Sequence, residues 1–402
     1  MNIYDQLGVR RRINAAGTLT RLGGSLMPPE VLEAMTEAAQ CSVDIAELQA
    51  RASAVIAECS GAEAGLVTSG AAAALTLGTA ACLTGLDVAR MERLPDTEGM
   101  PNEVIMCRTH RTAYDHAVRA AGARIREVGF NDRIVGAGVR GVEAWEIETA
   151  ITPQTVAIAY TASAMNEPPL REVVAVARAY ALAVIVDAAA QLPPAENLRR
   201  FIAEGAALVA FSGGKAIRGP QSTGILCGRR DLIAAAALQQ LDMDIAPETW
   251  NPPQDLIPRQ ALRGIPHHGL GRGFKVGKEE IVGLIVALQR FVKTDPTAEN
   301  AARERQLAAI AEGLSGIPYV AVRLLPAVET GRYPLLELRL DEVTLGRTAW
   351  GISLELQRGD LPVHLHERRA AEGILTVNPA ALRDGDEQVV TARLRAVLTK
   401  SA

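Results

Sequence analysis

The most informative stretch of this chain is FSGGKAIRGPQ, residues 211–221. Its lysine, Lys215, follows an apolar segment and stands beside two glycines, which is an unusual place for a surface lysine. A second apolar run, residues 182–186, ends in Asp187. Short apolar runs of this kind predict buried strands. We therefore expect one amine and one carboxylate at the ends of neighbouring strands, pointing into one crevice.

This pair of side chains indicates a specific cofactor chemistry. A lysine amine in a dry site loses its proton readily and forms Schiff bases with carbonyl groups. Pyridoxal phosphate needs such a lysine, and it needs a carboxylate that keeps its pyridinium nitrogen protonated. We predict these roles for Lys215 and Asp187, although an aspartate after a strand is also a common helix N-cap. Ala189 is small enough to let the flat ring lie close to the backbone.

Three further segments are candidates for cofactor contacts. The loop at Ser69, Gly70 and Ala71 follows a strand and opens a helix, so its N–H groups suit a phosphate; a tight packing turn is the alternative. Ser212 could donate to the same phosphate or bond within its own loop. His110 lies just past an apolar strand, where an imidazole could stack on the ring, shuttle a proton in catalysis or bond to the backbone.

Basic side chains later in the chain are candidates for substrate binding. Arg272 and Lys275 stand in a glycine-rich stretch that suits an anionic substrate group, although a solvated helix start would also place Lys275 there. His364 and His366 alternate along a predicted strand and share a face. Together with Arg368 they either line the pocket or are ordinary edge-strand residues. We expect no metal site, because the two histidines lack a third and a fourth ligand.

The composition argues against several classes of protein. The 402 residues carry a net charge of −4 and only 3% aromatic side chains, which disfavours a nucleic-acid partner. The five cysteines are widely spread and form no Cys-x-x-Cys pair, so we expect reduced thiols in a cytoplasmic protein. The N-terminal residues include an early acid and no apolar core, so we expect no signal peptide, and we expect no membrane span.

The order of elements predicts the fold class. Short β-branched runs alternate with alanine-rich helical stretches through the first two thirds of the chain. This alternation predicts an α/β fold in which helices cover both faces of a mostly parallel sheet. A proline-rich stretch at 246–273 breaks the pattern. We expect an N-terminal arm at 1–45, a large cofactor-binding domain at 46–262 and a small C-terminal α+β domain at 263–402.

A set of motifs runs through the whole chain. They are INAAGT at 13–18, GAE at 61–63 with TSG at 68–70, AGARIREVG at 121–129, IVD at 185–187, the stretch at 211–221, and GRGFKVGKE at 271–279. In combination they resemble the fold-type I pyridoxal-phosphate enzymes of the group that contains bacterial selenocysteine synthase and D-glucosaminate-6-phosphate ammonia-lyase. The resemblance extends from residue 13 to residue 398.

The resemblance carries expectations about the fold and the site. It implies a seven-stranded sheet, a Schiff base at Lys215, Asp187 at the ring nitrogen, and phosphate contacts from Ser69, Gly70 and Ala71. It also implies a homodimer or a larger homo-oligomer with sites at the subunit interface. Selenocysteine synthase has an additional N-terminal module for its tRNA, whereas here the first motif begins almost at residue 1, so we do not expect seryl-tRNA chemistry.

These observations predict a pyridoxal-phosphate-dependent lyase that acts on a small amino acid or amino-sugar acid. Lys215 would take the α-proton, and loss of the β-hydroxyl would give a 2-keto acid and ammonia. A racemase or epimerase is the first alternative and an aldolase the next, because the residues do not determine which bond breaks. A cofactor-binding protein without turnover is a further alternative. The substrate's side chain and stereochemistry stay open.

Overall fold

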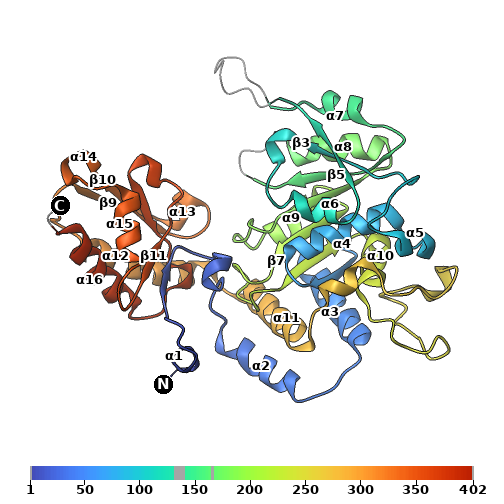
Figure 1. Ribbon diagram of the computed structural model, residues 1–402, viewed down its shortest axis with the longest axis horizontal. Coiled ribbons are helices and arrows are strands. Elements are labelled where there is room, and N and C mark those ends of the chain that lie inside the picture. Colours follow the sequence, from blue (N-terminus) through green and yellow to red (C-terminus); the bar gives the residue numbers. More distant parts are fainter. Residues whose placement is uncertain (1, 131–140, 164–166, 401–402) are drawn as a thin grey trace. The chain divides into compact units, whose positions relative to one another are not determined.

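A seven-stranded sheet forms the centre of the larger part of the chain (Figure 1). The structure is a computed structural model that describes residues 2–130, 141–163 and 167–400. The strand order is β2-β8-β7-β6-β5-β3-β4, and only β8 runs antiparallel to its neighbours. The strands are β2 (Ala64–Thr68), β3 (Glu103–Cys107), β4 (Arg124–Val128), β5 (Thr155–Thr161), β6 (Ala183–Asp187), β7 (Leu208–Ser212) and β8 (Gly224–Gly228). The predicted α/β fold with a mostly parallel sheet is confirmed.

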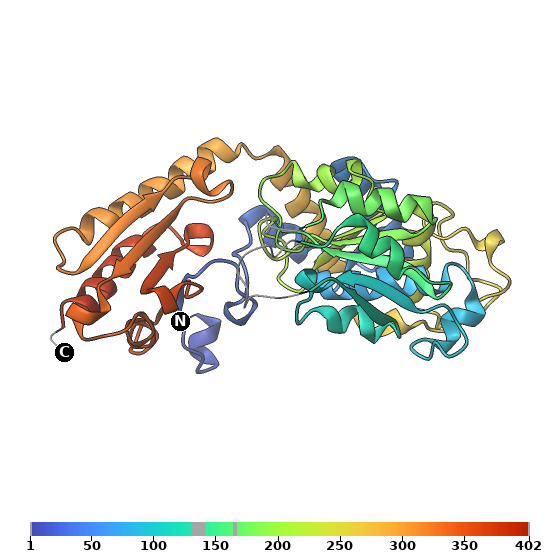
Figure 2. The same cartoon turned by 90° about the horizontal axis from the view of Figure 1, so that it is seen from above.

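Helices cover both faces of this sheet, so the inner strands are buried on two sides and consist of nearly continuous apolar runs (Figure 2). One face carries α7 (Ala144–Ala150), α8 (Leu170–Ala179) and α9 (Asn197–Ala203); the other carries α4 (Ala71–Thr84), α6 (Asp115–Ala120) and α10 (Arg230–Gln240). Small residues let α4 approach the strands closely. A Cβ atom on Gly78 would lie 3.2 Å from Cδ1 of Leu208.

The remaining helices of this part lie before, between and after the strands. They are α2 (Pro29–Ala39), α3 (Ile45–Ser60), α5 (Val88–Arg93) and α11 (Lys278–Lys293). The segment between α10 and α11 contains short 3-10 turns at Arg259–Ala261 and Leu270–Phe274. Its irregular backbone agrees with the proline-rich sequence there.

A second, smaller part combines the chain's two ends. It contains a parallel pair, β1 with β11, and an antiparallel sheet in the order β12-β10-β9. Leu307, Leu338, Ile352 and Leu394 are buried in its core. Its elements are α1 (Ile3–Gln6), β1 (Ile13–Ala15), α12 (Pro296–Gly313), β9 (Val320–Leu325), α13 (Ala327–Thr330), β10 (Leu335–Leu340), α14 (Glu342–Leu345), α15 (Ala349–Leu356), β11 (Val363–Leu365), β12 (Ile374–Val377) and α16 (Asp386–Leu398).

By their contacts, residues 1–26 and 293–402 form one compact unit and residues 27–292 form the other. The boundaries expected at 45 and 262 therefore fall inside the larger unit. Residues 13–15 join the small unit because β1 pairs with β11, a contact between distant positions that a reading along the chain does not reveal. The expected division of the chain into an arm and two domains stays a prediction. Among the residues described, none of the helices has the length and apolar character to cross a membrane.

Candidate active site

Three neighbouring strands end at the candidate site. Thr161 ends β5, Asp187 ends β6 and Ser212 ends β7, and in the register Thr161 pairs with Asp187 while Asp187 pairs with Ala210. The carboxyl ends of parallel strands meet at one edge of a sheet, where ligands of such folds bind. Lys215 lies in the turn that follows β7. The fold thus places the predicted lysine and aspartate at the same edge.

The turn that carries Lys215 depends on the two glycines before it. The N–H of Gly213 donates to the carbonyl of Thr223 (2.8 Å), and the N–H of Gly219 donates to the carbonyl of Gly213 (2.9 Å). A Cβ atom on Gly213 would lie 2.2 Å from Oγ1 of Thr223, and one on Gly214 would lie 2.5 Å from the backbone of Gln221. The turn is therefore too tight for any side chain at these positions.

Asp187 is partly buried, and its charge is affected by three groups. Burial raises the pKa of its carboxyl, whereas the N–H of Ala189, which donates to Oδ1 (3.0 Å), and the charge of Lys215 lower that pKa. The charge of Lys215 therefore reaches the Asp187 carboxylate. The bond from Ala189 also orients the carboxylate at the strand end.

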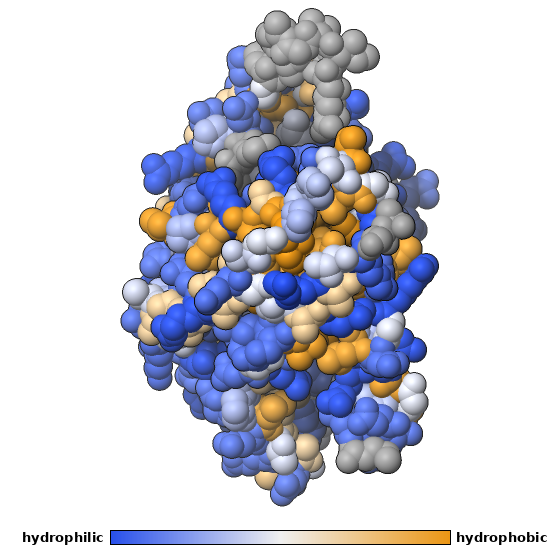
Figure 3. Space-filling model, turned by 90° about the vertical axis from the view of Figure 1, so that its left-hand side faces the viewer, coloured by the Kyte–Doolittle hydropathy of each residue, from blue (hydrophilic) through white to orange (hydrophobic). Residues whose placement is uncertain are grey.

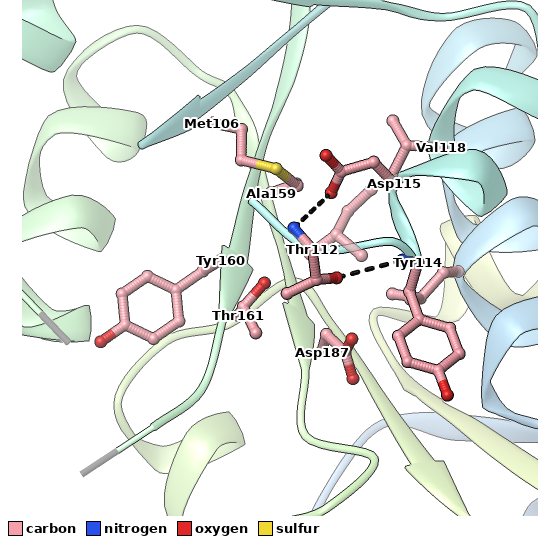
Figure 4. Close-up of a pocket in the computed structure, with 11 residues that line it drawn as sticks. Met106, Thr112, Tyr114, Asp115, Val118, Ala159, Tyr160, Thr161 and Asp187 are labelled. Atoms are coloured by element: carbon pink, nitrogen blue, oxygen red, sulfur yellow. Dashed lines mark hydrogen bonds between the residues drawn. The ribbon is translucent and has the colours of Figure 1, made fainter. Parts of the chain in front are cut away.

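A pocket lies against Asp187 (Figure 4). In that view the Asp187 carboxylate lies between Thr161 and Tyr114, with Thr112 above it. Asp115 accepts from the N–H of Thr112 (3.2 Å), so the loop that carries Thr112 and Tyr114 is tied to α6. The pocket is lined by Leu75, Met106, Thr112, Tyr114, Asp115, Val118, Ala159, Tyr160, Thr161, Ile185 and Asp187.

Of the residues that line this pocket, sequence reasoning had singled out only Asp187; Thr112, Tyr114 and Asp115 are among those that it missed. They follow the end of β3 by a few residues, as His110 does. Their place after a strand is the feature of the sequence that could have indicated a role in the site. Asp115 also pairs with Arg111. This ion pair stabilises the loop beside the pocket.

His110 is 1% exposed, and its ring meets the edge of the Tyr160 ring at 4.7 Å between centroids. Within the described chain, neither ring nitrogen makes a hydrogen bond of good geometry. Burial lowers the pKa of His110 to about 4, an effect that the nearby backbone of Glu167 only partly opposes. The imidazole is therefore neutral at pH 7, which suits stacking on a ring better than shuttling a proton.

The loop predicted to hold a phosphate lies next to Ser212. Gly70 has φ +98° and immediately precedes α4, whose first N–H groups have no acceptor inside the helix. In the register Gly224 pairs with both Thr68 and Ser212. A Cβ atom on Gly224 would lie 2.4 Å from the backbone of Gly70, so the strand packs directly against the loop. The Ser69–Gly70–Ala71 loop is thereby held one strand away from Ser212.

These residues fit pyridoxal phosphate. A half-buried amine follows β7, a carboxylate ends β6, and a bare helix N-terminus with a positive-φ glycine lies beside them. His110 is an aromatic residue beside the site, since its carbonyl accepts from Oγ1 of Thr161 (2.9 Å). Each group matches one part of the cofactor: aldehyde, ring nitrogen, phosphate and ring face.

Two of the predicted substrate residues lie in the segment after α10. Arg272 donates to Asp242 (2.6 Å), while Lys275 is exposed. Gln239 accepts from the N–H of Leu270 (3.1 Å), and Cβ atoms on either neighbouring glycine would collide with it. The segment is thus fixed in place, and the guanidinium of Arg272 is already engaged.

The other two lie in the small unit. His364 is buried in β11, and its Nε2 lies 3.1 Å from Nη1 of Arg12. Arg368 is exposed, and its charge lowers the pKa of His366, whose burial has the larger effect in the same direction. Arg12 was not among the predicted residues, because nothing in the sequence places it beside β11.

Comparisons with known proteins identify the family. The family described as L-seryl-tRNA selenium transferase matches residues 12–245. The chain is 32% identical to D-glucosaminate-6-phosphate ammonia lyase of Salmonella typhimurium, over 100% of this chain and 99% of the relative. It is 31% identical to 5'-C-glycyluridine monooxygenase-decarboxylase of a Streptomyces species, over 98% and 92%. Relatives named L-seryl-tRNA(Sec) selenium transferase are 25–30% identical.

The solved structures agree with the sequence relatives. A structure of D-glucosaminate-6-phosphate ammonia-lyase matches with a TM-score of 0.82 at 31% identity, covering 100% of this chain and 99% of that chain. The chain therefore belongs to the L-seryl-tRNA selenium transferase family and has the fold of type I pyridoxal-phosphate enzymes. It is an enzyme, and its cofactor is pyridoxal 5'-phosphate. The predictions of family, fold, cofactor and enzyme are confirmed.

Proposed function

We propose that this member of the L-seryl-tRNA selenium transferase family is an ammonia-lyase that converts a phosphorylated 2-amino sugar acid into a 2-keto acid and ammonia. The observation that carries the proposal is the full-length match to D-glucosaminate-6-phosphate ammonia lyase. The arrangement of Lys215, Asp187 and the α4 N-terminus supports it, because these groups are what α-proton chemistry on pyridoxal phosphate requires.

Each site residue has a proposed task in holding the cofactor. Lys215 would hold its aldehyde group, and the Asp187 carboxylate would keep its ring nitrogen protonated. Ser69, Gly70 and Ala71 bind the phosphate with backbone N–H groups and the helix N-terminus, and Ser212 adds a hydroxyl. His110 and Ala189 would pack against the ring. When bound, the cofactor supplies an electron sink for the charge left at the substrate's α-carbon.

The proton is moved by the lysine. With substrate bound, the Lys215 amine would take the α-proton on Nζ. The Cβ–O bond then breaks, and the hydroxyl leaves with a proton as water. Hydrolysis of the resulting enamine consumes one water and yields the 2-keto acid and ammonia. The neutral His110 adds no charge that would oppose protonation of the ring nitrogen.

Oxidative decarboxylation is the second candidate. The relative named 5'-C-glycyluridine monooxygenase-decarboxylase is nearly as similar over nearly the whole chain. Such a reaction would consume dioxygen and release carbon dioxide, whereas the elimination does neither. Oxygen uptake therefore separates the two candidates directly.

Seryl-tRNA is a poor substrate candidate despite the family's description. The relatives named L-seryl-tRNA(Sec) selenium transferase are less similar to this chain than the ammonia lyase and the monooxygenase-decarboxylase are. The net charge of −4 provides no general attraction for a polyanion. A small-molecule substrate is consistent with both of the full-length relatives.

We extend the proposal to a cytoplasmic homo-oligomer with sites at subunit interfaces. All five cysteines are free thiols, which suits a reducing compartment. Trp350 and Leu354 lie one turn apart on α15 and are 52% and 50% exposed. Figure 3 shows hydrophobic side chains gathered near the centre of one face, with hydrophilic side chains around them. Surfaces of this kind are typical of subunit contacts.

The test is a product assay with the holoenzyme. D- and L-2-amino-3-hydroxy sugar acids, each with and without a terminal phosphate, are incubated with the protein, and keto acid, ammonia and oxygen uptake are measured. Stoichiometric keto acid and ammonia without oxygen uptake supports the proposal. Oxygen uptake with carbon dioxide release would support the second candidate instead. Loss of optical rotation without keto acid would identify a racemase.

A further inference from the structure

The parallel pair of β1 and β11 has one apolar and one polar face. Ile13 and Ala15 belong to the small unit's core together with Val363 and Leu365. In the register Asn14 pairs with His364. Because alternate side chains of a strand point to opposite faces, Asn14 and His364 lie on the face away from the core. Arg12 reaches the same face, since its guanidinium contacts His364.

The contact between Arg12 and His364 determines which ring nitrogen of the imidazole carries the proton. A guanidinium only donates, so Nε2 of His364, 3.1 Å from Nη1 of Arg12, must be the acceptor. The imidazole is then neutral, with its proton on Nδ1. Nδ1 is buried and has no hydrogen-bond partner in the described part of the chain. The hydrogen bond from Arg12 to this buried histidine thus fixes the direction of the guanidinium.

A second cation lies on the loop that follows β1. The side-chain amide of Asn14 donates to the carbonyl of Gly17 (2.8 Å), and the N–H of Asn378 donates to the carbonyl of Ala15 (2.8 Å). Gly17 has φ +90°, and a Cβ atom there would lie 2.8 Å from Nδ2 of Asn378. The loop is therefore held tightly, and it carries Arg21, whose charge acts on His364.

The single carboxylate in this cluster is already satisfied by other groups. Glu367 lies 3.8 Å from Arg21, and it accepts from Oγ of Ser353 (2.6 Å) and Nε2 of Gln357 (2.7 Å). Arg12 and Arg21 are both exposed. The face thus presents two cations, one of them held by a buried imidazole, and its one acid is shared with neutral donors.

We infer that this face binds a small oxyanion, either a carboxylate or a phosphate ester, with Arg12 as the ligand-binding residue, Arg21 as the second cation and His364 as the residue that positions Arg12. The inference concerns the small unit alone and goes beyond the proposed function, on which it does not depend. A guanidinium binds either of them through parallel N–H donors.

The experiment measures anion binding by the holoenzyme and needs no turnover. Inorganic phosphate and acetate are titrated calorimetrically into the wild type, Arg12→Gln, Arg12→Lys and the matched control Arg11→Gln. We expect Arg12→Gln to weaken the binding of one of the two anions by about 10- to 100-fold, because a charge-assisted bond is lost. Arg12→Lys should weaken it less, and Arg11→Gln should leave it unchanged. The anion affected identifies the oxyanion that the face binds.

The positioning role of His364 has its own variants. His364→Gln keeps an acceptor for Arg12 and should keep most of the anion affinity, whereas His364→Phe removes the acceptor and should behave like Arg12→Gln. Equal anion affinities in the wild type, Arg12→Gln and Arg11→Gln would overturn the inference. Because binding is read without turnover, that result is distinguishable from a failure of the proposed reaction, which only the product assay tests.

Discussion

Lys215 lowers the pKa of the Asp187 carboxyl, although the two residues follow different strands of the sheet. The relationship arises from the pairing of β6 with β7, in which Asp187 is opposite Ala210 and the chain continues through Ser212 into the turn of Lys215. Burial acts against the lysine and raises that pKa. The net pKa of this carboxyl is raised, so burial outweighs the two groups that favour its ionised form, Lys215 and the N–H of Ala189.

Lys215→Ala should slow turnover strongly and prevent covalent attachment of the cofactor. We expect the rate to fall by about 10²–10⁴-fold, which is the usual contribution of a positioned general base. Borohydride reduction followed by peptide mapping should label Lys215 in the wild type and no lysine in the variant. Lys278→Ala is the matched control, because Lys278 pairs with Glu279 at the start of α11. A label on another residue in the wild type would contradict the assignment.

Asp187→Asn should raise the stability of the apoprotein and lower the activity of the enzyme. The folded state raises the pKa of this acid, so it disfavours the ionised form, and the apoprotein loses stability as the pH rises through the folded pKa. The neutral amide removes that cost, so we expect the apoprotein's Tm at pH 7 to rise. Activity should fall, because the ring nitrogen loses its anionic partner. Thermal unfolding and kcat of the variant are compared with those of Asp231→Asn, which removes an exposed carboxylate.

His110 should make the protein sensitive to acid. Its folded pKa of about 4 lies below the unfolded value, so the unfolded state binds more protons between about pH 6.5 and pH 4. The histidine's contribution to stability is complete above that window and is lost as the pH falls through it, by up to about 1 kcal/mol per pH unit. Urea unfolding of the apoprotein at several pH values should show a shallower pH dependence in His110→Phe. An unchanged slope would argue against the buried neutral state.

Gly214→Ala should destabilise the turn of Lys215. The added Cβ would lie 2.5 Å from the backbone of Gln221, which cannot move aside as a flexible side chain could. We expect a loss of about 1–3 kcal/mol in the free energy of unfolding, together with weaker cofactor binding. Gly264→Ala is the control, since a Cβ there would meet nothing within 4 Å. Similar behaviour of the two variants in urea unfolding and cofactor titration would refute the packing argument.

Much of the site could be predicted because its signals are local. The apolar runs before Asp187 and Ser212 gave the strands β6 and β7, and the small residues at 69–71 gave the loop before α4. Helix α10 was missed because nine of its eleven residues are buried, so it has no polar face and no amphipathic period. Thr112, Tyr114 and Asp115 were missed because they line the pocket only together with residues of α4, β3, β5 and β6, which are distant from them in the sequence or on other elements.

The amino-acid sequence was enough to predict the cofactor and the class of fold, since strand and helix periods, glycine turns and a lysine among glycines act over a few residues. The tertiary structure alone decided the strand order, the antiparallel insertion of β8 between β2 and β7, and the pairing of β1 with β11 that brings Arg12 to His364. These are contacts between residues up to 352 positions apart. They depend on which buried surfaces fit together, and no local pattern in the chain encodes that fit.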